Sequence, residues 1–346
     1  MSASGKTLKS VAELIETGLV APNAVADLEA VAQRYAIAIT PAMQVLIDHD
    51  DPNDPIAAQF VPTAEELVQR PEERADPIGD HAHSPVEGIV HRYPDRVLLK
   101  AVHSCPVYCR FCFRREMVGP DGDGTLAGEA LEAALAYIND NSEIWEVIFT
   151  GGDPLVLSPR RFRSILERLA TMEHVRIVRF HTRVPVADPA RVTAELVDAL
   201  QASGKTTYVA IHANHPRELT GDARAAIDRL HAAGIALVSQ TVLLKGVNDD
   251  AAILAELMRT FVELRIRPYY LHHPDLAPGT GHFRLSITEG QAIAAALHGR
   301  LSGLCQPTYV LDIPGGHGKA PIAAAMIERD GDRHRVTDFK GHIHAY

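Results

Sequence analysis

The sequence has few cysteines, no long apolar run and no excess of basic residues. Its 346 residues include four cysteines, and 34 Lys and Arg against 44 Asp and Glu give a formal net charge of −10. Such an acidic chain lacks the electrostatic footprint of a protein that binds nucleic acid or an anionic membrane. No apolar run is long enough to cross a bilayer, and the first residues lack the apolar core of a signal peptide. We therefore expect a cytoplasmic protein that binds neither nucleic acid nor a membrane.

Three of the four cysteines, Cys105, Cys109 and Cys112, lie within eight residues. Thiolates hold iron–sulfur clusters, and three of them leave one iron of a cubane free for a substrate or cofactor. Zinc prefers four ligands in paired C-x₂-C motifs, and no second pair exists. Disulfides are disfavoured because these cysteines are close together and odd in number. The C-x₃-C-x₂-C spacing therefore predicts a [4Fe–4S] cluster, whereas Cys305 fits a buried apolar position.

The order of apolar patterns predicts an α/β fold in three parts. Residues 1–85 have helical spacing of apolar residues. In residues 86–285, short apolar runs alternate with amphipathic helices, which predicts parallel strands with right-handed crossovers and a partial (βα)₆ barrel rather than the complete eight units. Residues 286–346 should add a helix, a seventh strand and a glycine-rich loop. The expected strands are Arg96–Val102, Trp145–Thr150, Val175–Thr182, Tyr208–His212, Ala236–Leu244, Arg267–His272 and Thr308–Ile313.

Chemically active residues follow several of these strands. Cys105 comes after the first strand, Gly151-Gly152-Asp153 after the second, and Arg183 after the third. Because parallel βα folds gather functional groups at the carboxyl ends of their strands, we expect these residues in one site.

From about Ser84 to Tyr346 the chain resembles the lysine 2,3-aminomutase family of radical S-adenosylmethionine (SAM) enzymes. The resemblance rests on separate motifs, namely His91–Arg96, Cys105–Arg115, Thr150–Pro154, His212–Pro216, Leu244–Asp249, Pro268–Tyr270 and Asp312–Lys319. In that family, SAM chelates the free iron, and its reductive cleavage gives a 5′-deoxyadenosyl radical. The resemblance thus implies a barrel fold, a cluster on Cys105, Cys109 and Cys112, SAM, and an electron donor such as flavodoxin or ferredoxin.

The same resemblance implies residues on the SAM side. Gly151 and Gly152 would let the backbone approach SAM, with Asp153 nearby, although two glycines also suit a tight βα turn. The other positions that resemble SAM-side residues are Arg183, His212 and Gln240.

A second cofactor, pyridoxal 5′-phosphate (PLP), is implied by Lys319 in the loop Pro314–Lys319. A Schiff-base lysine must be unhindered and partly desolvated, which flanking glycines allow. A Walker A phosphate loop is excluded because Ala320 stands where Ser or Thr is required. Arg92, Tyr93 and Arg96 resemble the family's PLP-contacting segment, in which arginine suits phosphate. The alternative for these three is a strand-edge ion pair and a packed tyrosine.

The resemblance also implies the substrate. Arg114 matches the arginine that binds the substrate carboxylate, and Asp275 and Asp312 match two aspartates that hold the ε-ammonium of lysine. Isolated aspartates are commonly caps or turn residues, but a doubly anionic end would repel the side chain of glutamate. We therefore expect an isomerase that moves the α-amino group of L-lysine to the β-carbon.

Other functions stay open at this point. A mutase for another amino acid, the β-lysine-forming enzyme of elongation factor P modification, and a simple iron–sulfur carrier all fit the cysteine run. Longer family members continue into a cysteine-bearing extension for zinc and oligomerisation, and they have a cysteine where this chain has Asp250. We expect a short form without that zinc site, and a homo-oligomer stays open.

Overall fold

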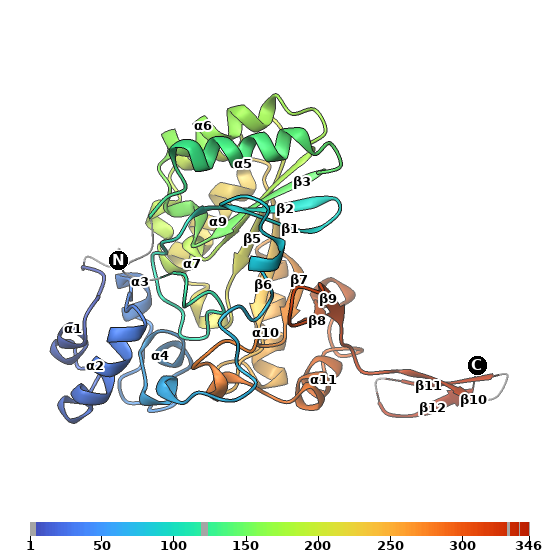
Figure 1. Ribbon diagram of the computed structural model, residues 1–346. Helices are drawn as coiled ribbons and strands as arrows, with labels where there is room; N and C mark the ends of the chain where they lie inside the picture. The colour runs from blue at the N-terminus through green and yellow to red at the C-terminus, as the bar shows by residue number, and fades with distance from the viewer. Residues whose placement is uncertain (1–4, 119–123, 331–332, 339, 346) are drawn as a thin grey trace.

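The computed structural model describes residues 5–118, 124–330, 333–338 and 340–345. Nine strands form one curled sheet in chain order (Figure 1). The strands are β1 (Ile89–Tyr93), β2 (Arg96–Val102), β3 (Glu146–Gly151), β4 (Ile177–Thr182), β5 (Thr206–His212), β6 (Ala236–Val242), β7 (Arg267–His272), β8 (Thr308–Asp312) and β9 (Lys319–Pro321). Strands β2 to β8 are parallel, and β1 and β9 pair antiparallel at the two edges. The predicted α/β half-barrel is therefore confirmed.

The sequence located the parallel strands well and missed both edge strands. Strands β2 and β7 have the predicted bounds, and β3 to β6 begin and end within two residues of them. β1 forms a hairpin with β2 in which Tyr93 faces Arg96 across the turn. β9 is a three-residue strand, and the sequence prediction placed its Lys319 in a loop. A strand of three residues carries little apolar alternation, so the pattern did not reveal β9.

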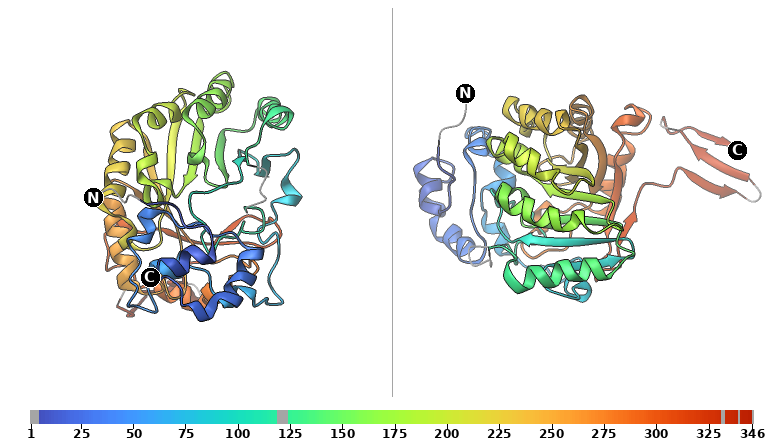
Figure 2. Two further views of the ribbon diagram at one scale, coloured as in Figure 1. Left: turned by 90° about the vertical axis from the view of Figure 1, so that its left-hand side faces the viewer. Right: turned by 90° about the horizontal axis from the view of Figure 1, so that it is seen from above.

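Helices cover the outer face of the sheet (Figure 2). They are α5 (Gly128–Asp140), α6 (Pro159–Ala170), α7 (Val184–Ala187), α8 (Ala194–Leu200), α9 (Gly221–Ala232), α10 (Ala251–Glu263) and α11 (Ile287–Ala295). Ser158 caps α6 by accepting a hydrogen bond from the Arg161 amide, and Pro159 occupies the first turn. The rings of Phe149, Phe162 and Phe180 lie within 6.2 Å of one another, centroid to centroid, and are fully buried. This outer face is the main apolar core.

Alternate residues of the same strands face the interior of the half-barrel. In β2, Leu99 and Ala101 belong to the outer core, so Lys100 between them points inward. In β4, Phe180 is in the outer core, and its neighbours Arg179 and His181 point inward. The inner face is therefore rich in charged and polar side chains, which is unusual for a packed barrel interior.

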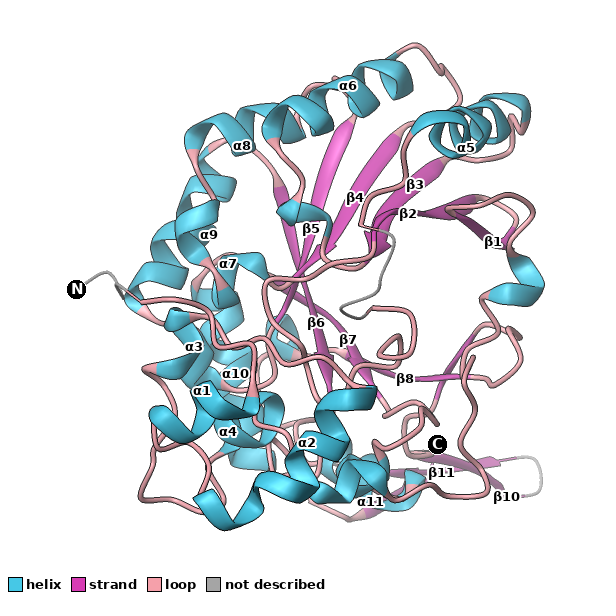
Figure 3. Ribbon diagram, turned by 60° about the vertical axis from the view of Figure 1, so that its left-hand side comes forward, coloured by secondary structure: helices cyan, strands magenta, loops and turns pink. Residues whose placement is uncertain are grey.

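The N-terminal helices gather at one end of the half-barrel, beside α7 (Figure 3). They are α1 (Val11–Glu16), α2 (Val25–Arg34), α3 (Pro41–Gln44) and α4 (Pro55–Phe60). They form a second apolar cluster that includes Val107 of the cysteine loop and Ala187 of α7. The sequence patterns did not identify α4, which Asp54 caps with two hydrogen bonds. This segment thus packs directly on the cysteine loop.

A three-stranded antiparallel sheet extends from the barrel at the C-terminal side (Figure 1). It consists of β10 (Ile327–Asp330), β11 (Arg333–Thr337) and β12 (Ile343–Ala345), none of which was predicted. Short 3₁₀ helices complete the chain: η1 (Pro22–Ala24), η2 (Ala64–Leu67), η3 (His81–His83), η4 (Pro154–Val156), η5 (Pro189–Arg191), η6 (Pro216–Glu218), η7 (Gly281–Phe283) and η8 (Gly303–Cys305). Among the described residues, no helix combines the length and apolarity needed to cross a membrane.

Candidate active site

The cysteine loop follows β2 and is held by the N-terminal segment. The Tyr108 amide donates to the Ala38 carbonyl at 3.0 Å, and the Arg110 amide donates to the Gln59 carbonyl at 2.8 Å. The buried Arg110 guanidinium also binds both carboxylate oxygens of Glu66. Bidentate pairs of this kind fix geometry as well as charge. The N-terminal helices therefore set the position of the three thiols.

The three thiols are free and lie close enough to influence one another. Burial raises the pKa of Cys105 well above its usual value, and Asp153 and the other two cysteines raise it further. Burial and then Cys109 raise the pKa of Cys112 to about 11. Protein surroundings alone do not favour three thiolates here, so a cationic group such as an iron cluster has to stabilise them.

Three thiols from one loop are the kind of ligand that holds an iron–sulfur cluster. Among the residues that the structure describes, no three His, Cys, Asp or Glu side chains converge as a site for one metal ion. A cluster of several irons is larger, so its thiolates surround a volume rather than a point. Three mutually interacting thiols in one loop meet that requirement.

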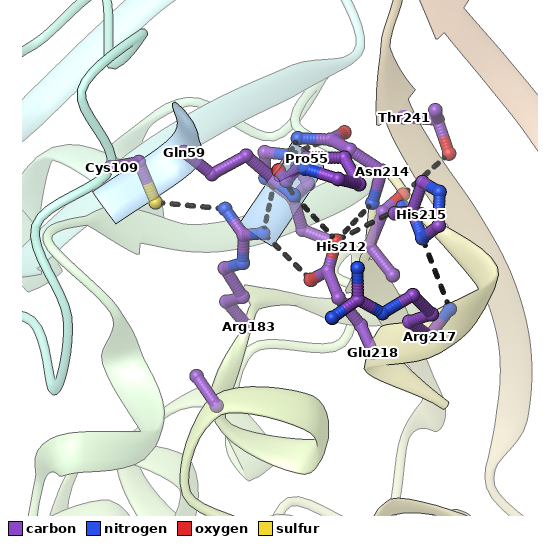
Figure 4. A network of polar contacts seen from close by, with 12 residues as sticks. Pro55, Gln59, Cys109, Arg183, His212, Asn214, His215, Arg217, Glu218 and Thr241 are labelled. Carbon is purple, nitrogen blue, oxygen red and sulfur yellow. Dashed lines mark hydrogen bonds and ion pairs between the residues drawn. The ribbon is translucent and has the colours of Figure 1, made fainter. Parts of the chain in front are cut away.

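Arg183, directly after β4, links the cysteine loop to two other elements (Figure 4). Its guanidinium donates to Cys109 Sγ at 3.0 Å, to Gln59 Oε1 at 2.6 Å and to Glu218 Oε2 at 2.6 Å. Although burial opposes its charge, Cys109 and Glu218 raise the pKa of Arg183. Arg183 is therefore a permanent cation beside a cluster thiol, and Glu218 is its counter-ion.

The same network continues to the end of β5. Glu218 Oε1 accepts from the amides of Asn214 and His215, and Asn214 Oδ1 lies 3.1 Å from His212 Nε2. Burial and the charge of Arg183 lower the pKa of His212 well below its usual value. His212 is therefore a neutral ring, and its Cα is paired with that of Gln240 in β6.

The glycines after β3 are required by close backbone approach. Gly151 has a φ of +108°, and a Cβ there would lie 2.5 Å from the Val102 carbonyl oxygen. A Cβ on Gly152 would lie 2.3 Å from the Ser104 carbonyl oxygen. Both glycines therefore allow this turn to pack on the segment that leads into Cys105.

The carboxylate of Asp153 is occupied by protein donors. It accepts from the Thr182 hydroxyl at 2.6 Å and from the amides of Arg183 and Leu155 at 2.6 and 3.0 Å. Burial raises its pKa, and these hydrogen bonds oppose the rise. Asp153 thus ties the β3 turn to the end of β4, which also fixes the position of Arg183.

A cationic group of side chains lies on the inner face near β2 and β3. Arg114 binds Asp80 Oδ2 through Nη2 at 3.0 Å and Nε at 3.2 Å, and its Nη1 donates to the Thr150 hydroxyl at 3.3 Å. Arg92 binds the other oxygen of Asp80 at 3.0 Å. Lys100 is the Cα partner of Thr150 and is buried beside this group.

A second group is anionic and lies near β7, β8 and β9. Asp312 ends β8, binds Lys319 Nζ at 2.5 Å and lies 3.5 Å from His272 Nδ1. Burial would raise its pKa, but His272 and Lys319 hold the pKa of Asp312 below its usual range. Burial and the charge of Asp312 raise the pKa of Asp275 to about 7, so the two carboxylates lie within electrostatic reach.

The two groups are connected by Arg92 and by the glycine loop. Arg92 Nη1 lies 3.9 Å from Asp312 Oδ1. The Lys319 amide donates to the Tyr93 hydroxyl at 2.9 Å, and the Arg96 guanidinium lies 3.8 Å from the centroid of the Tyr93 ring. A Cβ on Gly316 would lie 2.5 Å from the His83 ring, so a glycine lets this loop pack against η3.

The structure brings most of the expected site residues onto one end or the inner face of the half-barrel. The cysteines, Arg183 and His212 share the cluster side, whereas Arg92, Arg114, Asp312 and Lys319 share the charged interior. Arg96 lies at the hairpin, its side chain 31% exposed, and Asp95 is its ion-pair partner.

Several polar residues of the site were not predicted. They are Asp80, Lys100, Gln59 and Glu218. The sequence does contain an indication for Lys100. A lysine within the apolar run Arg96–Val102 indicates that one face of this strand meets polar groups. The others lie in loops or helices, and no local pattern distinguishes them.

Comparisons with known proteins first define the class. The profile of the radical SAM superfamily matches residues 100–258. An L-lysine 2,3-aminomutase of Clostridium subterminale is 40% identical over 90% of this chain and 74% of its own length. A putative L-lysine 2,3-aminomutase of Aquifex aeolicus is 37% identical over 99% of this chain and 91% of its own length. A glutamate 2,3-aminomutase of Clostridioides difficile is 36% identical over 88% of this chain and 71% of its own length.

This chain belongs to the lysine 2,3-aminomutase family of radical SAM enzymes. It is therefore an isomerase, and its superfamily implies a [4Fe–4S] cluster and SAM. The relatives act on different amino acids, so membership alone leaves the substrate open.

Proposed function

We propose that this enzyme converts L-lysine to β-lysine, using a [4Fe–4S] cluster, SAM and PLP. The observation that carries the proposal is the pair of carboxylates, Asp275 and Asp312, in the same interior as the cation Arg114. A lysine attached through its α-amine offers a carboxylate to one end and an ammonium to the other. Complementary charge at both ends supports lysine as the substrate.

For the cluster side, Cys105, Cys109 and Cys112 would hold three irons, and SAM would bind the fourth. The candidates for contacts to SAM are Gly151, Gly152, Asp153, Arg183, His212 and Gln240. His212, with its neutral ring, and Gln240 are Cα partners on adjacent strands, which supports a shared ligand there. Asp153 and Arg183 already have protein partners, so their contribution is to shape the turn and to hold Cys109.

For PLP, unpaired buried atoms support a ligand beside Lys319. Arg92 Nε and Asp312 Oδ1 are buried and have no hydrogen-bond partner among the residues that the structure describes, and such atoms normally face a ligand or water. Lys319 would attach the cofactor, while Arg92, Tyr93 and Arg96 would contact it near the hairpin. When bound, PLP would supply the imine that lets the amino group migrate.

The protein itself supplies orientation and a dry site. Arg114 would hold the α-carboxylate and Asp275 with Asp312 the ε-ammonium, so the substrate is fixed at both ends. Asp312 lies against Lys319 and His272, and the neutral His272 keeps an anion at this position. A glutamate substrate would place its second carboxylate against these aspartates, which disfavours it.

The test is anaerobic reconstitution with iron, sulfide, PLP, SAM and a reductant, followed by assays with lysine and with glutamate. We expect β-lysine and no β-glutamate. An intact cluster spectrum and bound PLP with no product from lysine contradict the substrate assignment. Conversion of glutamate alone would favour the second candidate, a glutamate mutase, for which the relative of Clostridioides difficile is the supporting observation.

We further propose that the enzyme works in the cytoplasm and takes its electron from a flavodoxin or ferredoxin. A thiol-held cluster with a free iron is suited to a reducing compartment. The Asp275→Asn and Asp312→Asn variants should each lose affinity for lysine and should not lose the cluster.

A further inference from the structure

Lys100 is a buried cation that the proposed chemistry has not used. Its side chain points to the inner face, because Leu99 and Ala101 on either side lie in the outer core. The residue is 6% exposed. Among the described residues, its ammonium has no hydrogen-bond or ion-pair partner. A lysine is rarely this buried without a partner, so an unpaired one points to a ligand.

Its neighbours explain which kind of ligand fits. Burial lowers the pKa of Lys100, Asp80 and Asp76 oppose that effect, and Arg114 adds to it. Asp80 already binds Arg92 with one oxygen and Arg114 with the other. Its carboxylate is therefore shared between two cations. Arg92 also lies 3.9 Å from Asp312 Oδ1, so the three cations Lys100, Arg92 and Arg114 face two carboxylates and keep an excess of positive charge.

A third carboxylate, that of Asp76, does not remove the excess of positive charge. Asp76 accepts hydrogen bonds from the amides of Asp80 and His81 and lies 3.4 Å from the His81 ring. It therefore stabilises the turn before η3 and acts on Lys100 only from outside hydrogen-bond range. Buried cations without matched anions are costly, and an anionic ligand would relieve that cost.

Position along β2 decides between two anions, a substrate carboxylate and the phosphate of PLP. Arg96 and Tyr93 lie at the hairpin end of β2, where they contact each other. Lys100 lies two inward-facing positions further, toward the cysteine loop. At that level Thr150 is its strand partner, and the Thr150 hydroxyl binds Arg114. Lys100 thus lies beside the proposed carboxylate arginine, whereas Arg92 of the phosphate segment is joined to this group through Asp80.

We propose that Lys100 and Arg114 together form a two-cation site for the α-carboxylate of the amino acid substrate. Asp80 is the positioning residue that holds Arg114 in this site. This inference rests on the proposed aminomutase function and adds a specificity residue to it. The enzyme then recognises its substrate as an α-amino acid through two charged donors at one end and the aspartates at the other.

The test compares Lys100→Met with the wild type in binding an amino acid and its α-amide, which lacks the carboxylate charge. Titration calorimetry on the anaerobically reconstituted enzyme measures lysine against lysinamide, and glutamate against its α-amide. Lys100→Met should weaken the binding of lysine by about 10- to 100-fold. It should change the binding of lysinamide by less than about 2-fold. Lys9→Met, at an exposed lysine, is the matched control.

Other results would contradict either the carboxylate site or the assignment of lysine as the substrate. Equal weakening of lysine and lysinamide, or no weakening of either, contradicts the carboxylate site. Loss of PLP content in Lys100→Met assigns the lysine to the phosphate instead. A wild type that binds glutamate and not lysine overturns the lysine assignment, while the glutamate pair still tests Lys100. A wild type that binds neither overturns both.

Folding is checked in parallel. Because removal of an unpaired buried charge relieves desolvation, the melting temperature of ligand-free Lys100→Met should be equal to or above that of the wild type. A lower melting temperature together with unselective loss of binding identifies a structural role and overturns the proposal. Lys100→Gln, which keeps polarity without charge, gives a second variant and should show the same selective loss.

Discussion

The two faces of the curled sheet use neighbouring residues for opposite purposes. In β4, Phe180 is fully buried in the outer core, whereas Arg179 and His181 on either side of it point into the half-barrel. In β2, Leu99 faces the helices and Lys100 faces the interior. The outer face is apolar and close-packed, and the inner face carries buried polar and charged groups. Within the described part of the chain, its atoms Asp312 Oδ1 and His181 Nε2 have no hydrogen-bond partner.

This difference teaches that stability and ligand binding are separated by the two-residue period of a strand. Substitutions on the outer face should change the free energy of unfolding and leave the site of the remaining folded molecules intact. Substitutions on the inner face should change binding and chemistry and have small or even favourable effects on stability. The following predictions test that separation.

The largest effect on function is expected for Lys319→Ala, on the inner face. Loss of the amine removes the attachment point of PLP, so activity with lysine should fall by at least about 10³-fold. The near-ultraviolet to violet absorption band of bound PLP should disappear, while the iron content stays unchanged. An iron–sulfur carrier would never show that band, so a wild type that lacks it contradicts the PLP proposal.

The largest effect on stability is expected for Phe180→Ala, on the outer face. The ring packs 4.9 Å from Phe149 and 5.4 Å from Phe162, centroid to centroid, so truncation leaves a cavity that costs about 3–5 kcal/mol. Denaturant unfolding of the protein measures this loss. Iron and SAM binding per folded molecule should equal those of the wild type, and Phe180→Leu should recover much of the stability. A site defect in well-folded Phe180→Ala contradicts the separation.

For Asp275→Asn, on the inner face, we expect a smaller change in the free energy of unfolding. This change is a gain in stability, whereas Phe180→Ala loses stability. Burial and the charge of Asp312 raise the pKa of Asp275 to about 7, whereas an unfolded aspartate loses its proton near pH 4. Between these values the folded protein binds more protons, so its stability falls as the pH rises through this window. Asparagine has no proton to lose, so the variant should be more stable than the wild type by about 1 to 3 kcal/mol above pH 7.

The measurement for Asp275→Asn is thermal unfolding without lysine at pH 5 and at pH 8. The stability gain should be clear at pH 8 and small at pH 5. Lysine affinity should change in the other direction, because the ionised carboxylate is what attracts the ammonium. In the wild type, lysine binding should strengthen as the pH rises through 7. A variant that is less stable at pH 8 shows that Asp275 is ionised and paired in the folded protein.

The sequence predicted the parts of the molecule that rest on local patterns. Short apolar runs predicted the bounds of β2 and β7, and the cysteine spacing indicated a cluster loop after the first parallel strand. Local patterns could not locate Glu218, because its role depends on Arg183 of another strand end and on Gln59 of α4. They also could not show that Asp80 joins Arg92 to Arg114, since that bridge connects η3 with two other segments.

The charged inner face of the sheet is the main feature that the sequence patterns did not predict. Lys100 broke an apolar run, but a single lysine in a strand has no partner in the sequence to define its role. Only the curvature of the sheet brings it beside Asp80 and Arg114. Contacts between residues far apart in the chain carry the specificity of the site, whereas repeating local patterns carry the fold.

The smallest effect is expected at an exposed ion pair outside both faces. Arg163 Nη2 in α6 lies 2.7 Å from Asp198 Oδ2 in α8, and the two side chains are 42% and 72% exposed. Water and salt screen such a pair, and ordering two side chains offsets its attraction. Arg163→Ala should therefore leave the unfolding midpoint and the binding of lysine unchanged.

A buried ion pair gives the comparison. Arg183 and Glu218 are 2.6 Å apart and both buried, so Glu218→Gln should lower the unfolding midpoint clearly. Equal effects of the two variants would mean that the distance between the charged atoms, and not their burial, determines the strength of an ion pair here.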